Sequence, residues 1–385
     1  VTDVARETAA DGDKVDLVIY LSEGDKYTVN SVDATGIEVV DQADVISRLE
    51  MQPGSVYSSQ CIKNDIKALR KYYGNNGYTN ARVMPRITSA GGTSVDIQYE
   101  VSEGVQSTVE LINISGNDIT QDKVIRRELA LAPGDVFNQD LMEVSRNRLL
   151  GLGYFETVEV TPTAAATPHH TDINISVREQ STGSINFGAA FSSVDNIYGL
   201  IELTQTNFNI RGKPRFLGGE GMRGAGQKIR LNLRAGAERQ DVAIDFTEPW
   251  LFDRRLSLGV GGYFRDLQFY SDYYDQRDAG GYISLRKPLG EFSSLSLKVT
   301  GENIEVDVDS DASDELKEED GSYTRGLVGL TYLYDTRDSQ YLTRRGHVLS
   351  ASIDGSFGDV SNVAVTLRGS KYFLLPLDTI FSVSG

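Results

Sequence analysis

The stretch Lys-Ile-Arg-Leu-Asn-Leu-Arg, from Lys228 to Arg234, decides the fold of the second half of the chain. In it, Ile229, Leu231 and Leu233 alternate strictly with charged or amide side chains. A period of two places these two kinds of side chain on opposite faces of a β-strand. The stretch therefore predicts a strand with one apolar and one polar face.

The same alternation continues after Gln180, where helical periodicity disappears. Further strands are predicted at Ser184 to Phe191, Asp241 to Thr247 and Ser294 to Thr300, and near Gly199, Leu256, Ala279, Arg325, Val348, Val363 and Ile380. These segments predict about eleven antiparallel strands. A polar face with Lys, Arg and Asp beside an apolar face of Ile, Leu, Val and Phe is typical of a transmembrane β-barrel.

A soluble β-sandwich is the alternative, because it alternates in the same way with its polar face outward. Two features favour the barrel. Many strands reach the roughly 9–11 residues that span a membrane at a tilt. The connections also alternate between tight turns, at Leu251 to Arg255 and Lys287 to Phe292, and long polar loops, at Leu267 to Asp278 and Asp307 to Ser322. The connection from Phe208 to Gln227 is unusually long for an inner turn.

The first half of the chain contains an internal repeat with an offset of 80 residues. Gly36 and Gly116 each close a first strand, and Gly54 and Gly134 each stand in a turn 18 residues later. Each copy predicts the order β-α-α-β-β, a small α+β module with a three-stranded sheet under two helices.

An earlier copy contributes its last strand, because Val15 to Gly24 aligns with Val95 to Gly104. Four segments are therefore predicted: residues 1–24 as the end of a preceding module, 25–104 as a module, 105–180 as the last module, and 181–385 as the N-terminal part of the barrel. We expect the mature N-terminus and further C-terminal strands to lie outside this chain, since a barrel must close in lipid.

The composition limits the function classes. The net charge of −17 argues against a nucleic-acid partner, because phosphate binding needs a basic surface. No stretch approaches the roughly 18–20 consecutive apolar residues that a membrane helix needs, which excludes helical membrane proteins. Cys61 is alone, so the chain forms no intrachain disulfide.

Three patterns resemble ligand sites and are interpreted otherwise. Gly219, Gly221 and Gly224 have the spacing of a dinucleotide fingerprint, but no strand–turn–helix pattern surrounds them, so we predict a flexible connection. His169 and His170 follow a turn sequence, and structural zinc is disfavoured there.

The third pattern is acidic, with the spacing of a calcium loop at Asp307, Asp309, Asp311, Ser313 and Glu318. Ala312 stands where such a loop needs Gly. A solvated acidic loop is therefore favoured, and a calcium site is left open. No catalytic constellation is found, so the sequence predicts no enzyme, no cofactor and no metal centre.

Two sets of motif residues carry a resemblance to known proteins. One set lies in the last module: Gly116, Asn117, Arg126, Arg127, Gly134, Gly153, Tyr154 and Phe155. The other set, Glu248, Pro249 and Trp250, follows the predicted strand from Asp241 to Thr247. Together they resemble the BamA family of bacterial outer-membrane assembly proteins: the first set is similar to the family's last POTRA module, and the second to the motif that ends the family's fourth barrel strand. The resemblance covers essentially the whole chain.

The resemblance implies a 16-stranded barrel in the bacterial outer membrane with POTRA modules in the periplasm. It implies a protein that folds and inserts β-barrel proteins. The implied partners are unfolded outer-membrane β-barrel clients, accessory assembly lipoproteins, periplasmic chaperones and outer-membrane lipid. A polypeptide-secreting or TamA-like transporter of the same superfamily is the alternative.

The family also implies a weak seam at the first barrel strand, which suggests a gate strand: Ser184, Ile185, Asn186, Phe187, Gly188, Ala189, Ala190 and Phe191. Small side chains at Gly188, Ala189 and Ala190 give weak cross-strand packing. A weakly paired edge can be lent to a client strand by β-augmentation. Ordinary variation near a bend is the alternative interpretation.

Overall fold

The structure, a computed structural model, describes residues 3–8, 15–20, 24–192, 196–214, 221–236, 239–271, 273–339 and 343–385. These residues form two compact units, and the boundary between them passes through the last module. The first unit contains the first complete module, and the second contains the long β-sheet with the parts of the last module that contact it. Among the described residues, no helix has the length and apolar character needed to cross a membrane.

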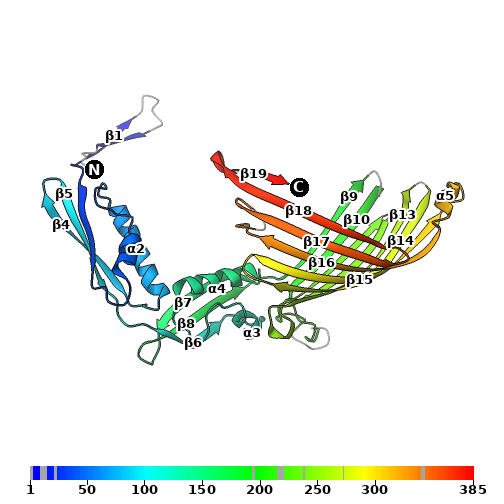
Figure 1. Cartoon of the computed structure of the whole chain (residues 1–385), viewed down its shortest axis with the longest axis horizontal. Helices are drawn as coiled ribbons and strands as arrows, with labels where there is room; N and C mark the ends of the chain where they lie inside the picture. The colour runs from blue at the N-terminus through cyan, green and yellow to red at the C-terminus, as the bar shows by residue number, and fades with distance from the viewer. Residues whose placement is uncertain are drawn as a thin grey trace. The chain divides into compact units, whose positions relative to one another are not determined.

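The predicted β-α-α-β-β order is confirmed in both modules (Figure 1). After a hairpin of β1 (Asp3–Thr8) and β2 (Val15–Tyr20), the first complete module contains β3 (Thr28–Thr35), α1 (Gln42–Ser47), α2 (Ser59–Asn75), β4 (Arg82–Gly91) and β5 (Ser94–Ser102). The last module contains β6 (Thr108–Ser115), α3 (Asp122–Arg126), α4 (Gln139–Gly151), β7 (Phe155–Ala164) and β8 (His170–Glu179). Their sheets have the orders β3-β5-β4 and β6-β8-β7.

Helix α2 shows why the sequence forms these elements. Ser58 caps the helix by accepting a hydrogen bond from the amide of Cys61. Ile62, Leu69 and Tyr73 recur at helical spacing and are almost completely buried against the sheet. The helix is therefore attached by one apolar face, which leaves its opposite face in solvent.

The second half of the chain is one 11-stranded antiparallel sheet in which every strand pairs with its sequence neighbours (Figure 1). Its strands are β9 (Gly183–Ser192), β10 (Asn196–Phe208), β11 (Gln227–Gly236), β12 (Arg239–Glu248), β13 (Ser257–Ser271), β14 (Tyr274–Pro288), β15 (Ser293–Val308), β16 (Gly321–Asp335), β17 (Gly346–Gly358), β18 (Asn362–Leu375) and β19 (Thr379–Ser384). The predicted count of about eleven strands is confirmed. Within the described part of the chain, β9 and β19 are the two edges.

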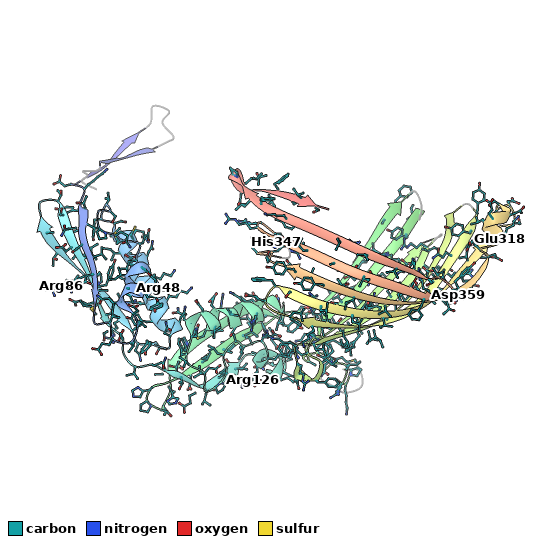
Figure 2. The ribbon with its side chains drawn as sticks, viewed as in Figure 1. Arg48, Arg86, Arg126, Glu318, His347 and Asp359 are labelled. Atoms are coloured by element: carbon teal, nitrogen blue, oxygen red, sulfur yellow. The ribbon has the colours of Figure 1, made fainter. Side chains whose placement is uncertain are left out.

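The connections agree with the prediction except at one hairpin. The tight turns are confirmed: η2 (Leu251–Asp253) lies between β12 and β13, and a short turn joins β14 to β15. A second 3-10 turn, η3 (Pro376–Asp378), joins β18 to β19. The acidic loop after β15 is also confirmed, and it carries α5 (Asp314–Lys317) and Glu318 (Figure 2).

The predicted long loop from Leu267 to Asp278 is wrong. Strands β13 and β14 continue through it, and Ser271 pairs with Tyr274. Polar side chains do not end these strands, because Arg277 forms cross-strand ion pairs with Asp266 at 3.6 Å and Glu305 at 3.9 Å. Aromatic residues in the segment also favour extended backbone.

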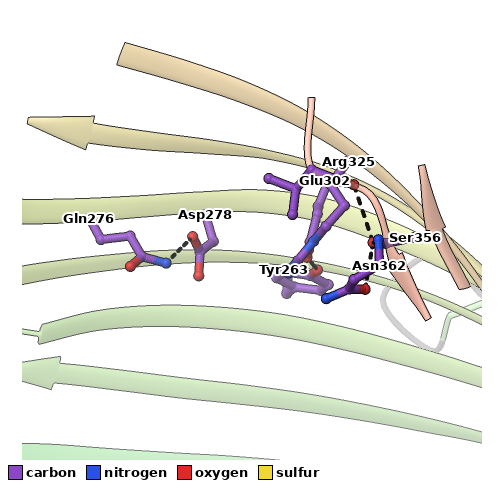
Figure 3. A network of polar contacts seen from close by, with 8 residues as sticks. Tyr263, Gln276, Asp278, Glu302, Arg325, Ser356 and Asn362 are labelled. Carbon is purple, nitrogen blue, oxygen red and sulfur yellow. Dashed lines mark hydrogen bonds and ion pairs between the residues drawn. The ribbon is translucent and has the colours of Figure 1, made fainter. Parts of the chain in front are cut away.

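The polar face of the sheet carries a connected row of side chains (Figure 3). Tyr263 donates its hydroxyl hydrogen to Glu302, and Arg325 Nε donates to the same carboxylate at 2.6 Å. Gly280 lies between Tyr263 and Glu302 in the register, and a side chain there would collide with both. The alternation therefore gives the expected charged face, stabilised by side-chain contacts among β13, β15 and β16 that pass over Gly280 of β14.

Candidate functional site

The predicted gate strand forms the first edge of the sheet. All eight residues from 184 to 191 lie in β9, which pairs along its length with β10. Among the described residues, no strand pairs with the other side of β9. Phe187 is 82% exposed, and Ile185 and Phe191 are also largely exposed. Strand β9 therefore presents a row of large apolar side chains on one face.

Cross-strand packing is weakest in the middle of this edge. Ala189 pairs with Gly199, so two small residues face each other. Gly188 pairs with Leu200 and offers no side chain of its own. Cross-strand side-chain pairs contribute roughly 0.2–1 kcal/mol each. The middle of the β9–β10 pair lacks most of this stabilisation.

A second site joins the last module to the inner connections of the sheet, and both sides of it belong to the same compact unit. We call it the junction cluster: Thr120, Arg127, Glu128 and Tyr154 from the module, with Asn207, Gly226, Glu248 and Trp250 from the sheet side. Four of these residues (Arg127, Tyr154, Glu248 and Trp250) are motif positions quoted from the sequence. The structure brings them together.

Trp250 is the centre of the charged half of the junction cluster. Its Nε1 donates to Glu128 at 2.9 Å, and its backbone N–H donates to Glu248 at 3.1 Å. The Arg127 guanidinium carbon lies 5.6 Å from the Trp250 ring centroid, within cation–π distance. Pro249 begins the turn that places the indole there.

Burial controls the electrostatics of this cluster. It lowers the pKa of Arg127, while the carboxylates of Glu128 and Glu248 act in the opposite direction. The Nε of Arg127 is buried and makes no hydrogen bond to any described residue. Burial likewise raises the pKa of Tyr154 to about 12. The Tyr154 hydroxyl therefore stays protonated and donates to the carbonyl of Gly226 at 3.2 Å.

Asn207 makes the hydrogen bonds in the uncharged half of the junction cluster. It is 2% exposed, and its Nδ2 donates to Thr120 Oγ1 at 2.8 Å. Its Oδ1 accepts from the amide of Gly226 at 2.8 Å. In addition, the amide of Gln121 donates to the carbonyl of Gly224 at 2.9 Å. The long connection between β10 and β11 is therefore explained, because it reaches the module and packs there.

The other motif positions mostly shape the last module. Gly116, Gly134 and Gly153 all have positive φ. Phe155 is buried, and Asn117 donates to the carbonyl of Thr120 and to Asp122. Arg126 lies on the surface with an ion pair to Asp122 at 3.5 Å (Figure 2).

The three patterns set aside as ligand sites take ordinary local roles. Gly219 lies outside the described residues, while Gly221 and Gly224 lie in the connection between β10 and β11. In the acidic loop, Ser313 caps α5 by accepting from the amide of Leu316. His170 begins β8 directly after the turn at His169. Across the described ranges, no group of three or more His, Cys, Asp or Glu is placed to hold a metal ion.

Sequence reasoning missed Asn207 and Thr120, and it met Glu128 and Glu179 only within longer motif runs, without a role of their own. Glu179 accepts from the amides of Ile119 and Thr120 at 2.8 and 2.6 Å, which fixes the loop that contacts Asn207. The repeat carried a signal for it, because Glu103 ends the first complete module and binds the equivalent loop amides. Asn207 had no comparable signal beyond the unusual length of its connection.

Comparisons with known proteins agree with this architecture. Residues 222–385 match the Omp85 superfamily domain, and residues 27–104 and 107–180 match the surface antigen variable number repeat, the POTRA family. The second part of the chain is thus similar to the Omp85 superfamily domain, and the first part is similar to POTRA repeats.

The chain is 24% identical over 335 residues to outer membrane protein assembly factor BamA of Nitratidesulfovibrio vulgaris, which covers 85% of this chain and 40% of that protein. It is 26% identical over 314 residues to BamA of Neisseria meningitidis, covering 80% and 38%. The fold matches the crystal structure of BamA from Haemophilus ducreyi lacking POTRA domains 1-3, with a TM-score of 0.71, 19% identity and coverage of 93% and 71%. The chain thus spans about 40% of the length of these curated relatives.

Proposed function

We propose that this chain is part of an outer-membrane assembly factor that folds and inserts β-barrel proteins. The protein belongs to the bacterial outer membrane, with its POTRA modules in the periplasm. The observation that carries the proposal is the weak cross-strand packing in the middle of β9, at Gly188 and Ala189, beside the exposed Ile185, Phe187 and Phe191. The names of the BamA relatives support the same function.

The proposed mechanism needs no covalent chemistry. A client strand that enters lipid must pair its backbone N–H and C=O groups, since each unpaired group costs several kcal/mol there. The β9 edge supplies such a partner by β-augmentation. The weak Ala189–Gly199 and Gly188–Leu200 pairs make this part of the sheet easier to deform while the client is accepted.

The proposal extends to the segments and partners. Residues 1–24 are the end of a preceding module, 25–104 and 105–180 are POTRA modules, and 181–385 is the N-terminal part of the barrel. The clients are unfolded outer-membrane β-barrel proteins, and the further partners are accessory assembly lipoproteins, periplasmic chaperones and outer-membrane lipid.

Site-specific crosslinking tests the edge directly. A photo-crosslinking amino acid at Asn186 on β9 is expected to capture nascent barrel clients in cells. The matched control is the same amino acid at Thr300, also on the polar face but in β15, a strand paired on both sides. Capture at Thr300 to the same extent, or none at Asn186 while clients still assemble, would contradict strand templating at β9.

Depletion of the full-length protein separates the alternatives. We expect a loss of many folded outer-membrane barrels. Loss of one secreted polypeptide with other barrels intact would instead support a secretion pore of the same superfamily.

A further inference from the structure

A hollow of about 930 Å³ lies between the first complete module and the last module, within one compact unit. We call it the intermodule groove. Helix α2 forms one wall and the first turns of α4 form another. Residues 78–82, Phe137, and Val160 and Pro162 of β7 complete the lining. A hollow of this size can bury a drug-sized ligand or several residues of a peptide.

The groove is basic although the chain carries a net charge of −17. Its lining includes two carboxylates, Asp140 and Glu143, and five cations: Lys67, Arg70, Lys71, Arg82 and Arg146. An adjoining hollow of about 320 Å³ along α2 adds Lys63. The local charge therefore opposes that of the whole chain and favours an anionic occupant.

The cations on α2 repel one another when no anion is bound in the groove. Lys63, Lys67 and Lys71 follow one another at intervals of four residues on α2. Like charges at this spacing destabilise a helix. Lys71 is balanced by Asp140 at 2.9 Å. Lys67, Arg70 and Arg82 make no ion pair with any residue that the structure describes, so their charges remain available.

The groove is held in shape by hydrogen bonds between the modules. Asn75 Nδ2 donates to Asp140 at 2.6 Å, and the amide of Asp140 donates back to Asn75 Oδ1 at 3.0 Å. Asn138 Nδ2 donates to the carbonyl of Asn75 at 2.8 Å. A site that is already formed costs less conformational entropy when it binds.

The lining also includes apolar side chains. Phe137 and Met142 lie almost buried in it, and Tyr78, Val160 and Pro162 are partly or fully exposed. We propose that the intermodule groove binds an acidic peptide segment of a partner protein, with carboxylates at the cations and apolar side chains against this lining. A lipid headgroup or free phosphate matches the cations but leaves the apolar part of the lining without a partner.

Fluorescence anisotropy tests this proposal with the full chain in detergent. The probe is a fluorescein-labelled peptide of about ten residues in which Glu and Leu alternate. We expect saturable binding that weakens steeply with added salt, because screening acts on exposed charges. The variant Lys67→Glu/Arg70→Glu should lower the affinity at least about tenfold through like-charge repulsion, and Lys67→Gln/Arg70→Gln should give an intermediate loss.

The matched control is Lys26→Glu/Arg86→Glu, which makes the same change in net charge at positions that do not line the groove. It should leave the affinity within about twofold of the unmodified chain, since distant exposed charges are largely screened. Equal losses in the two charge-reversal variants would overturn the proposal. Displacement of the peptide by glycerophosphoglycerol at lower concentration than by unlabelled peptide would also overturn it, in favour of a headgroup site.

Discussion

At the scale of single residues, glycines with positive φ differ in what surrounds them. Gly116 and Gly134 have φ of +83° and +94°, so both use backbone that other residues adopt only with strain. A Cβ at Gly116 would also collide with the carbonyl oxygen of Val177, whereas a Cβ at Gly134 would meet nothing within 4 Å. Glycine is therefore required at Gly116 by both the backbone conformation and the nearby Val177 carbonyl, and at Gly134 by the backbone conformation alone.

This difference can be measured. Gly134→Ala should lower the free energy of unfolding of the last module by about 1–2 kcal/mol, which is the cost of the left-handed conformation. Gly116→Ala should lower it by more, because the strand must also move. Hydrogen exchange of the α4 amides reports both values. Equal losses would show that the collision with Val177 is relieved at no cost.

At the scale of elements, periodicity predicted the helices and strands because each is set by neighbours in the sequence. The period-two runs gave the strands of the long sheet, and the repeat gave the order of each module. The hairpin of β13 and β14 was predicted too short, because its polar outer half is stabilised by Arg277 and its cross-strand partners. Polarity alone does not reveal such pairs.

The candidate site was predicted in part. The motif residues include Arg127, Tyr154, Glu248 and Trp250. The sequence did not predict that these four residues lie in one cluster. More than a hundred residues separate Glu128 from Trp250, and the contact depends on how the module packs on the sheet. Asn207 is an ordinary polar residue in the sequence and acquires its role only through burial between Thr120 and Gly226.

The contact between the two modules predicts a dependence on pH. The hydrogen bond from Lys71, followed by that from Asn75, holds the pKa of Asp140 below its ordinary value. A carboxylate with a depressed folded-state pKa stabilises the fold above its unfolded pKa of about 3.9, and this contribution is lost as the pH falls through the folded value. The effect is small, since both side chains are about half exposed.

Spin labels at Gln60 and Asn147, in a Cys61→Ser background, can report the distance between the modules. We expect a narrow distance distribution at neutral pH that broadens below about pH 4. Asp140→Asn should broaden it at neutral pH and remove most of the pH response, while Glu143→Gln should behave like the unmodified chain. An identical pH response in Asp140→Asn would assign the effect to other carboxylates.

At the scale of the whole molecule, the junction cluster connects the POTRA region to the barrel sheet through side chains that lie far apart in the sequence. Trp250 contributes both a hydrogen bond to a carboxylate, worth about 1.5–3 kcal/mol, and a ring face for Arg127. Motion of α3 is therefore coupled to the turn between β12 and β13.

Trp250→Phe tests this coupling, because it keeps an aromatic ring and removes the Nε1 donor. Glu128 then loses this hydrogen bond and keeps its ion pair with Arg127 at 3.9 Å. Protection of the α3 amides from hydrogen exchange should fall by about 1–3 kcal/mol. Phe252→Leu is the control, because Phe252 is 82% exposed in the same turn. Unchanged protection in Trp250→Phe would show that backbone contacts such as Gln121 to Gly224 suffice.

The neighbour-by-neighbour order of the long sheet also has a kinetic consequence. Each strand pairs with the next one along the chain, so every new pairing closes only a short loop. Low contact order of this kind favours stepwise growth, one hairpin at a time. During that growth the newest strand always has one edge whose backbone groups are unpaired. The protein therefore passes through the same kind of exposed intermediate that it is proposed to stabilise in its clients.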